Sequence, residues 1–251
     1  MPRTLVSLGS NLGDANAAID AAIEGLEKLA IAGTLRVSER FATSPIGGPA
    51  GQSDFVNAAA TFDCDLSPFE LLASLHEIEY LLDRERHSRW AARTLDTDLL
   101  LYGEEVIDEP SLRVPHPRMS FRPFVLEPAV QIAGDWRHPE GSQTLAQLLD
   151  QLQHGADALL LLGDDGAARR WIVDDRGITI RVVEDASELA ARPRLTIDAS
   201  PIRSEANVAG PRLALADCPA EHWRDEVLAA VECVWPRDVS ISPPPQLAPG
   251  Q

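Results

Sequence analysis

The residues best suited to chemistry lie within residues 84–101, which read RERHSRWAARTLDTDLLL. Asp96 and Asp98 occupy alternate positions of an apolar run that stops at Gly103, and this pattern predicts a strand over residues 95–102. Side chains alternate across a strand, so the two aspartates share one face, roughly 6–7 Å apart at the backbone. Mg²⁺ favours oxygen ligands from one or two carboxylates together with substrate phosphates. The pair therefore predicts a magnesium site.

Arginines precede these aspartates and frame one aromatic residue: Arg84, Arg86, Arg89 and Arg93, with Trp90 among them. A guanidinium fork binds phosphate in bidentate fashion. Arginines followed by paired carboxylates indicate metal-assisted transfer of a phosphoryl-type group. The alternative is a solvated arginine run beside an Asp-x-Asp pair that serves only as polar chemistry at a strand end.

Composition limits the classes of protein to consider. The chain has 251 residues, 45% of them hydrophobic, with no uninterrupted apolar run long enough to span a membrane and no signal-peptide pattern at its start, so we expect a cytoplasmic protein. A net charge of −17 argues against nucleic acid as a partner. The cysteines are too widely spaced for a zinc site or a disulfide framework and are expected to be reduced: Cys64, Cys218 and Cys233.

The elements that must position the candidate residues follow one order in the first hundred residues. Strands are expected at 4–8, 35–43, 55–62 and 94–102, and helices at 15–30 and 67–82. This β-α-β-β-α-β order predicts an α+β fold with the ferredoxin-like arrangement, an antiparallel sheet with helices on one face. We take the glycine-rich turn at 9–14 as a structural turn first and a ligand contact second, with Asn11 or Asp14 as a cap. The irregular loops 44–53 and 84–92 are expected to close over substrate.

Five motifs together resemble one family. They are SLGSNLGD at 7–14, TSPIGGPAGQSDFVNA at 43–58, IEYLLDRER at 78–86, RWAARTLDTDLLLYG at 89–103 and VPHPRMSFRPFVLEP at 114–128. In order and without large gaps, they resemble the 6-hydroxymethyl-7,8-dihydropterin pyrophosphokinase family (2-amino-4-hydroxy-6-hydroxymethyldihydropteridine diphosphokinase) over residues 1 to about 155. The resemblance implies transfer of pyrophosphate from ATP to the hydroxymethyl oxygen of the reduced pterin, releasing AMP, in folate biosynthesis, with two Mg²⁺ ions.

The resemblance also implies roles for individual residues. The metal ligands would be Asp96 and Asp98, and the catalytic set Arg84, Arg86, Arg93 and Asp98. The ATP phosphates would be held by Arg86, Arg93, His116 and Arg122. The pterin would stack between Trp90 and Phe124, with Asn57 at its polar edge and Thr43, Ile46 and Phe55 around it. Glu79 would have a supporting role.

Two departures from the family pattern concern packing and loop closure. Thr97 stands where the family often has an aliphatic residue, on the face away from the metals. Ala91 and Ala92 replace a frequent glycine-proline pair, which affects how the arginine loop closes.

The rest of the chain lies outside the resemblance. We expect a pyrophosphokinase domain over 1–162, ending in a helix near 145–152, a small α+β accessory domain over 163–242 and a disordered tail over 243–251. Within the accessory part we predict strands at 170–173 and 178–183 joined by a hairpin turn, further strands at 195–199 and 213–216, and a helix at 220–234. It is too short for the dihydropteroate synthase that sometimes accompanies the family, so self-association or docking is the expected role.

Two other readings of the sequence compete with an active pyrophosphokinase. A non-catalytic binding or scaffolding protein would keep the fold and work through residues 163–242, but the candidate metal and phosphate residues are all present. A different ATP-dependent transferase would keep the aspartate pair and need another acceptor pocket, against which Trp90, Phe124 and Asn57 argue.

Overall fold

The computed structural model describes residues 2–82, 92–141, 143–164, 166–176, 180–201 and 210–236. An antiparallel sheet has the strand order β2-β4-β1-β5, with β3 also paired to β4. Its strands are β1 (Arg3–Ser10), β2 (Arg36–Val37), β3 (Phe41–Thr43), β4 (Phe55–Asp63) and β5 (Asp96–Tyr102). A separate hairpin joins β6 (Ile107–Glu109) to β7 (Leu112–Val114). The strand expected at 35–43 is thus two short strands, separated by residues 38–40.

The two helices between these strands begin where local capping chemistry sets them. At α1 (Ala15–Leu29), the Asp14 carboxylate accepts a hydrogen bond from the backbone N–H of Ala17 at 3.0 Å. At α2 (Pro68–Leu81), Ser67 and Glu70 form a reciprocal capping box, with proline in the first turn. Both helices were expected near these positions, and of the two possible caps for α1 the structure selects Asp14.

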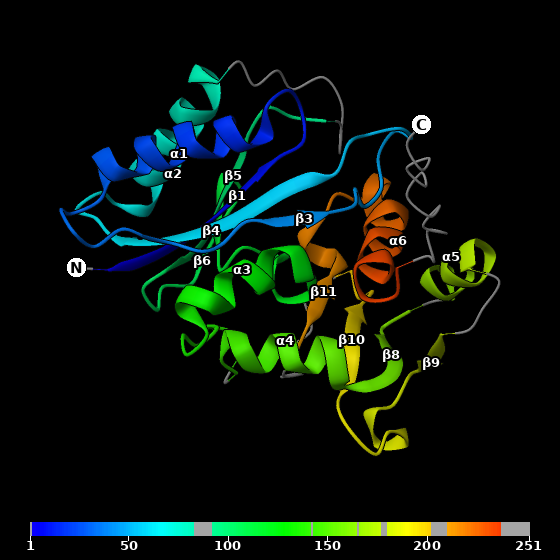
Figure 1. Cartoon of the computed structure of the whole chain (residues 1–251). Helices are drawn as coiled ribbons and strands as arrows, with labels where there is room; N and C mark the ends of the chain where they lie inside the picture. The colour runs from blue at the N-terminus through cyan, green and yellow to red at the C-terminus, as the bar shows by residue number, and fades with distance from the viewer. Residues whose placement is uncertain are drawn as a thin grey trace, which may run out of the picture.

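Both faces of the antiparallel sheet are covered. Val6 and Leu8 pack into an apolar cluster with α1 and α2, while Leu5 and Ala59 face a second cluster. That second cluster includes α3 (Pro123–Ala133), which contacts β4, so α3 lies across the sheet from α1 and α2 (Figure 1). The expectation of helices on one face therefore holds for α1 and α2 but misses α3. Strands covered on both faces are buried along most of their length, as β4 is.

A second sheet of four parallel strands follows, in the order β11-β10-β8-β9. Its strands are β8 (Ala156–Leu162), β9 (Arg181–Val183), β10 (Pro193–Asp198) and β11 (Arg212–Ala214). The helices around it are α4 (Leu145–His154), α5 (Ala167–Arg176) and α6 (Trp223–Val234), and the 3₁₀ turns are η1 (Met119–Phe121), η2 (Ala186–Glu188), η3 (Leu215–Asp217) and η4 (Ala220–His222).

The strand predicted at 170–173 and the hairpin after it are wrong. Residues 167–176 form α5, and β9 pairs with β8 in parallel, an arrangement that requires a crossover connection rather than a tight turn. We did not predict β8, which lies ahead of residue 163 yet pairs with β10 beyond it. The helix near 145–152 and the later elements are confirmed to within a few residues, although α6 begins at Trp223 after η4.

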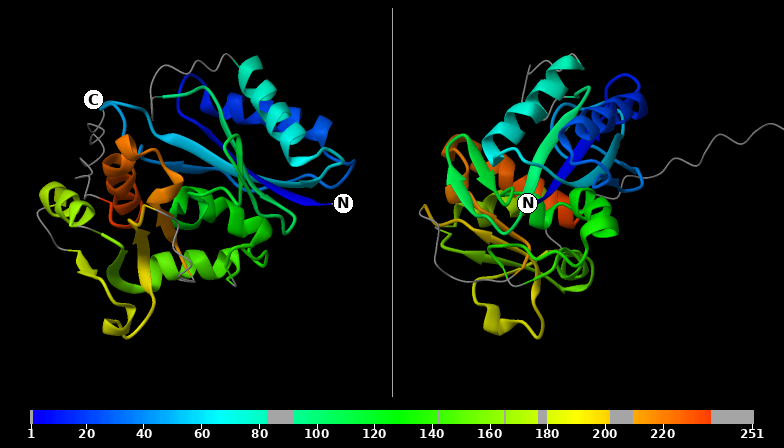
Figure 2. Two further views of the ribbon diagram at one scale, coloured as in Figure 1. Left: turned by 180° about the vertical axis from the view of Figure 1, so that it is seen from behind. Right: turned by 90° about the vertical axis from the view of Figure 1, so that its left-hand side faces the viewer.

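The two sheets share one apolar cluster. It joins Leu5 of β1 and Leu126 of α3 to Leu159 of β8, Leu195 of β10 and Val231 of α6. Figure 2 shows the second sheet and α6 lying against the side of the antiparallel sheet that α3 covers. Among the helices that the structure describes, none has both the length and the apolar character needed to cross a membrane.

Candidate active site

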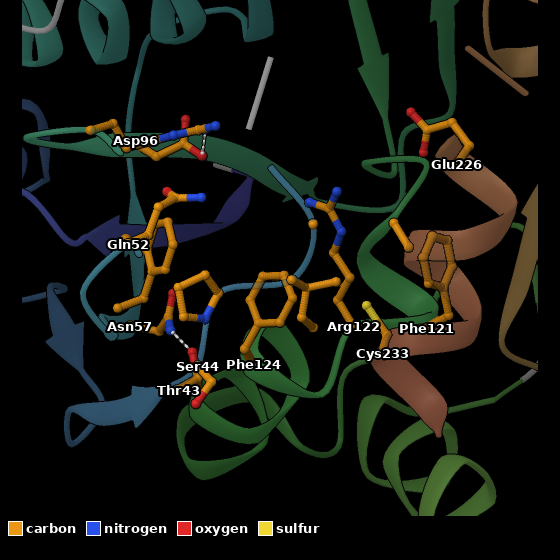
Figure 3. Close-up of a pocket in the computed structure, with 17 residues that line it drawn as sticks. Thr43, Ser44, Gln52, Asn57, Asp96, Phe121, Arg122, Phe124, Glu226 and Cys233 are labelled. Carbon is orange, nitrogen blue, oxygen red and sulfur yellow. Dashed lines mark hydrogen bonds and ion pairs between the residues drawn. The ribbon is translucent and has the colours of Figure 1, made fainter. Parts of the chain in front are cut away.

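A pocket lies between the end of the antiparallel sheet, the loop after β3, the start of α3 and helix α6 (Figure 3). Of the residues selected from the sequence, those that line it are Thr43, Ile46, Phe55, Asn57, Arg93, Asp96, Arg122 and Phe124. Asp98 and His116 line a second cavity, which also contains Arg118. Arg84, Arg86 and Trp90 lie outside the described residues.

Gly9 of β1 lies between two residues of the pocket, one on each neighbouring strand. It pairs with Asn57 of β4 on one side and with Asp96 of β5 on the other. Directly opposed residues of neighbouring strands point to the same face, so Asn57 and Asp96 face the pocket together. A side chain at position 9 would come within 3.1 Å of the Asn57 amide oxygen. Glycine here therefore keeps the space around Asn57 open.

Asn57 is nearly buried, and its orientation is fixed by β3. Its Nδ2 donates a hydrogen bond to Thr43 Oγ1 at 2.7 Å. Phe55, two residues earlier on β4, pairs with Thr43 in the β3–β4 register. Phe124 comes from the first turn of α3, and the Arg122 guanidinium lies 5.5 Å from the centre of its ring. Phe121 also lines the pocket, which thus combines an oriented amide with three aromatic rings, a lining suited to a flat heteroaromatic molecule.

Asn11 connects the loops on either side of the pocket, a role that we did not predict. Its Oδ1 accepts a hydrogen bond from the backbone N–H of Arg93 at 2.9 Å, and its own N–H donates to the Arg93 carbonyl at 3.1 Å. Its Nδ2 reaches the Ser53 carbonyl at 3.2 Å and Gln52 Oε1 at 3.3 Å. An asparagine inside a glycine-rich turn was the available sequence signal, but the partners are distant in the chain.

The aspartate pair lies on β5 as the alternation predicts. Asp96 and Asp98 have partly exposed side chains, and Asp96 forms an ion pair with Arg93. Thr97 points to the opposite face, where its backbone N–H donates to Glu79 Oε1 at 2.7 Å and its hydroxyl lies 3.1 Å from the same oxygen. Buried Glu79 of α2 therefore fixes the start of β5, and its supporting role in the site stays a prediction.

The aspartate pair fits magnesium by number and type of ligand. Across the described ranges there is no group of three or more His, Cys, Asp or Glu side chains able to hold a metal ion. Two neighbouring carboxylates do not make an all-protein cage, but they match the one or two carboxylates that Mg²⁺ takes when substrate phosphates complete its coordination.

His116 is held as a neutral hydrogen-bond donor. Its Nδ1 accepts a hydrogen bond from the backbone N–H of Arg118 at 3.3 Å, so the proton of the neutral ring lies on Nε2, which is 4.0 Å from Asp98 Oδ2. Burial lowers the pKa of His116 to about 3, and the charges of Arg122 and Arg118 contribute to the same shift. The imidazole is therefore neutral near pH 7.

Arg122 is a partly buried cation at the pocket wall. Burial, and then the charge of Arg118, lower the pKa of its guanidinium. A cation partly removed from water and near a second cation favours a bound anion, because the anion supplies counter-charge. Opposite Arg122, Glu226, Ala229 and Cys233 of α6 complete the lining, and we did not predict any of these three residues as part of the site.

Fold and pocket together define a small-molecule-binding protein with a paired-aspartate strand beside an arginine- and aromatic-lined cavity. A family model described as 7,8-dihydro-6-hydroxymethylpterin-pyrophosphokinase (HPPK) matches residues 5–134, and the chain belongs to this family. The 2-amino-4-hydroxy-6-hydroxymethyldihydropteridine pyrophosphokinase of Pseudomonas aeruginosa is 44% identical over 139 residues, 55% of this chain and 85% of that protein. The Haemophilus influenzae protein of the same name is 39% identical over 146 residues, 58% of this chain and 90% of its own length.

A solved structure of Plasmodium falciparum HPPK-DHPS is also similar, with a TM-score of 0.49 and 11% sequence identity. The alignment covers 76% of this chain and 57% of that chain.

Proposed function

We propose that this protein transfers pyrophosphate from ATP to 6-hydroxymethyl-7,8-dihydropterin, giving the pterin diphosphate and AMP, in folate biosynthesis. The observation that carries the proposal is the convergence at Gly9, which sets Asn57 and Asp96 on either side of β1, on the face that lines the pocket. The Asn57 amide can bind the polar edge of a pterin, and the Asp96 carboxylate can bind a cation that is also bound to phosphate. Membership of the family and the names of the relatives support the same reaction.

The pterin would occupy the end of the pocket around Asn57. The Asn57 amide offers a donor and an acceptor to the ring edge, while Thr43, Ile46 and Phe55 surround it. Phe124 supplies one aromatic face for stacking, and we assign the other to Trp90.

The phosphates would occupy the end that Arg93 and Arg122 line, and we assign Arg84 and Arg86 to the same phosphates. Neutral His116 donates its Nε2 hydrogen to a phosphate oxygen without adding charge. Arg122 supplies a partly buried positive charge whose environment already favours an anion. These groups hold the triphosphate and offset the charge that moves with the pyrophosphoryl group.

Asp96 and Asp98 would hold two Mg²⁺ ions, which would neutralise phosphate charge and help to ionise the hydroxymethyl group. In the transfer itself, the pterin hydroxymethyl oxygen forms a bond to the β-phosphorus of ATP. The bond between that phosphorus and the α,β-bridging oxygen breaks, and AMP leaves with the bridging oxygen. We assign the hydroxyl proton to a carboxylate oxygen of Asp98.

The topology of the first part of the chain and the location of the protein in the cell belong to the same proposal. The antiparallel order β2-β4-β1-β5, with α1 and α2 as connections, supports a ferredoxin-like arrangement of the first part of the chain. Use of ATP as a substrate supports a cytoplasmic location. Self-association or docking through residues 163–242 remains a prediction.

The test is pterin-dependent AMP release by the full chain with ATP and Mg²⁺, with the pterin diphosphate identified by mass spectrometry. Asp98→Asn should lower kcat at least about a thousandfold, because it removes a metal-binding charge and the proton acceptor. Asp65→Asn, which makes the same charge change at an exposed position, is the matched control and should retain wild-type rates. Near-normal turnover by Asp98→Asn would show that the metal assignment is wrong. Absence of AMP from folded wild-type protein would favour a non-catalytic binding protein.

A further inference from the structure

One wall of the pocket comes from a part of the chain that the family match does not reach. The match ends at residue 134, whereas Glu226, Ala229 and Cys233 of α6 line the pocket. Figure 3 shows Glu226 and Cys233 on this helix, beside the segment that carries Arg122. Helix α6 therefore contributes directly to the lining of the site. Among these residues Glu226 stands out, because it is a carboxylate with only 2% of its surface exposed.

Glu226 makes a two-point contact with Arg118. Its Oε2 accepts a hydrogen bond from Arg118 Nε at 2.9 Å, and its Oε1 accepts one from Nη2. Burial would by itself lower the pKa of Arg118, but the hydrogen bonds and charge of Glu226 outweigh it and raise that pKa. Paired, charge-assisted contacts of this kind fix both the position and the orientation of a guanidinium.

In the sequence, Arg118 lies between His116 and Arg122, two of the residues assigned to the ATP phosphates. Its backbone N–H donates to His116 Nδ1 and so sets which nitrogen of His116 carries the proton. Its positive charge acts on both His116 and Arg122. Glu226 supplies counter-charge for Arg118 and Arg122, both partly buried, and it does so from a site 108 residues along the chain from Arg118.

Two further contacts hold the same segment from the C-terminal side. Arg113 Nη1 lies 2.6 Å from Asp217 Oδ1, at the end of η3. Ser120 Oγ donates to the Arg212 carbonyl at 3.3 Å and accepts from the Arg212 N–H at 3.2 Å, at the first residue of β11. Residues 113–122, which carry His116 and Arg122, are thus held at three points by residues 212–226.

We propose that Glu226 is a positioning residue for the phosphate end of the pocket, acting through Arg118 on His116 and Arg122. Residues 212–226 are then a working part of the site rather than a separate docking module. This inference rests on the proposed function for the identity of the anion, the ATP phosphates, and adds a role for a residue outside the family match.

The test compares Glu226→Gln with Asp225→Asn in the full chain. Glu226→Gln keeps the size of the side chain but removes its charge, and the KM for ATP should rise about tenfold while the KM for the pterin stays within about twofold. Asp225→Asn makes the same change one residue earlier on the exposed face of α6 and should leave both constants unaltered. A purely structural effect would lower the amount of active enzyme, and hence kcat, without raising the KM for ATP.

A double-mutant cycle tests the route through Arg118. Arg118→Gln should raise the KM for ATP, and adding Glu226→Gln to it should change that constant less than about twofold, because the two residues act as one unit. The double variant removes both charges of the Glu226–Arg118 pair together, so it is the variant to measure if Glu226→Gln alone fails to fold. Glu226→Asp, which keeps the carboxylate, should recover part of the loss.

An unchanged KM for ATP in folded Glu226→Gln protein, tighter ATP binding, or additive effects in the cycle would each overturn the proposal. Failure of the proposed function is a separate result, seen as no pterin-dependent AMP from the wild type. In that event, calorimetric titration with magnesium and α,β-methylene-ATP tests the positioning role of Glu226 without turnover. Weaker binding to Glu226→Gln than to the wild type supports the positioning role, and equal or absent binding to both excludes it.

Discussion

The antiparallel and parallel sheets contribute to the pocket in different ways. The antiparallel sheet places residues assigned to the reaction directly, from strand positions that face the pocket, such as Asn57 and Asp96. The parallel sheet and α6 mainly hold other residues in place, as Glu226 does for Arg118. A site can therefore be recognised from the motifs of one region while its geometry depends on another region that carries no recognisable motif.

The largest expected effect tests whether the two regions unfold together. Leu195→Ala in β10 and Leu75→Ala in α2 each remove a fully buried side chain and should each cost about 2–5 kcal/mol of unfolding free energy. Because the cluster around Leu195 also contains residues of β1 and α3, we expect both variants to shift one common transition in urea. Leu81→Ala, on the exposed face of α2, is the control and should cost less than about 0.5 kcal/mol. Two separate transitions, only one of them moved by Leu195→Ala, would contradict a shared unit.

A smaller effect should separate the Asn11 contacts from the Glu226 contact. Asn11→Ala removes the side-chain hydrogen bonds to both flanking loops, so kcat/KM should fall about thirtyfold for ATP and for the pterin alike. Glu226→Gln, by contrast, should affect the ATP constants alone. Asn16→Ala, the same substitution at an exposed position of α1, should stay within about twofold of the wild type. A loss confined to one substrate would mean that Asn11 supports only one side of the pocket.

The smallest effect concerns Cys233, the residue of α6 that brings a sulfur to the lining. Burial raises the pKa of its thiol to about 12, so the reactive thiolate is a minute fraction at pH 8. Alkylation of Cys233 by iodoacetamide should be negligible at pH 8, become faster as the pH rises toward 12, and reach the rate of an ordinary thiol only after unfolding. Mass spectrometry of digested protein reports the site. Rapid alkylation at pH 8 in the folded state would show that the Cys233 thiol is accessible to solvent or that its pKa is not raised.

Much of the antiparallel region could be predicted because its signals are local. Ser67 and Glu70 form their capping box within four residues, and the alternation around Thr97 fixes which face the aspartates share. The parallel region gave weaker local signals. The sequence Trp171-Ile172-Val173 followed by acidic residues and Gly177 favours a strand and a turn, yet residues 167–176 are helical because β8 and β9 pair in parallel.

The contacts of Asn11 and Glu226 could not be predicted from spacing for a related reason. Asn11 bonds to Arg93, 82 residues away, and Glu226 to Arg118, 108 residues away. No periodicity encodes a partner at such separations. The resemblance to the family placed the residues assigned to the reaction, but it ended before α6 and so could not indicate the residues that support them.

The α6 wall has a consequence for inhibitor selectivity. A compound that fills the pocket and extends toward Ala229 and Cys233 would gain part of its affinity from residues beyond the family-matched range. The Pseudomonas aeruginosa relative, 85% of which is already covered by its match to this chain, has little sequence left from which to form a comparable wall. Compounds grown in this direction should therefore discriminate between this enzyme and such shorter relatives, even where the residues around the pterin are the same.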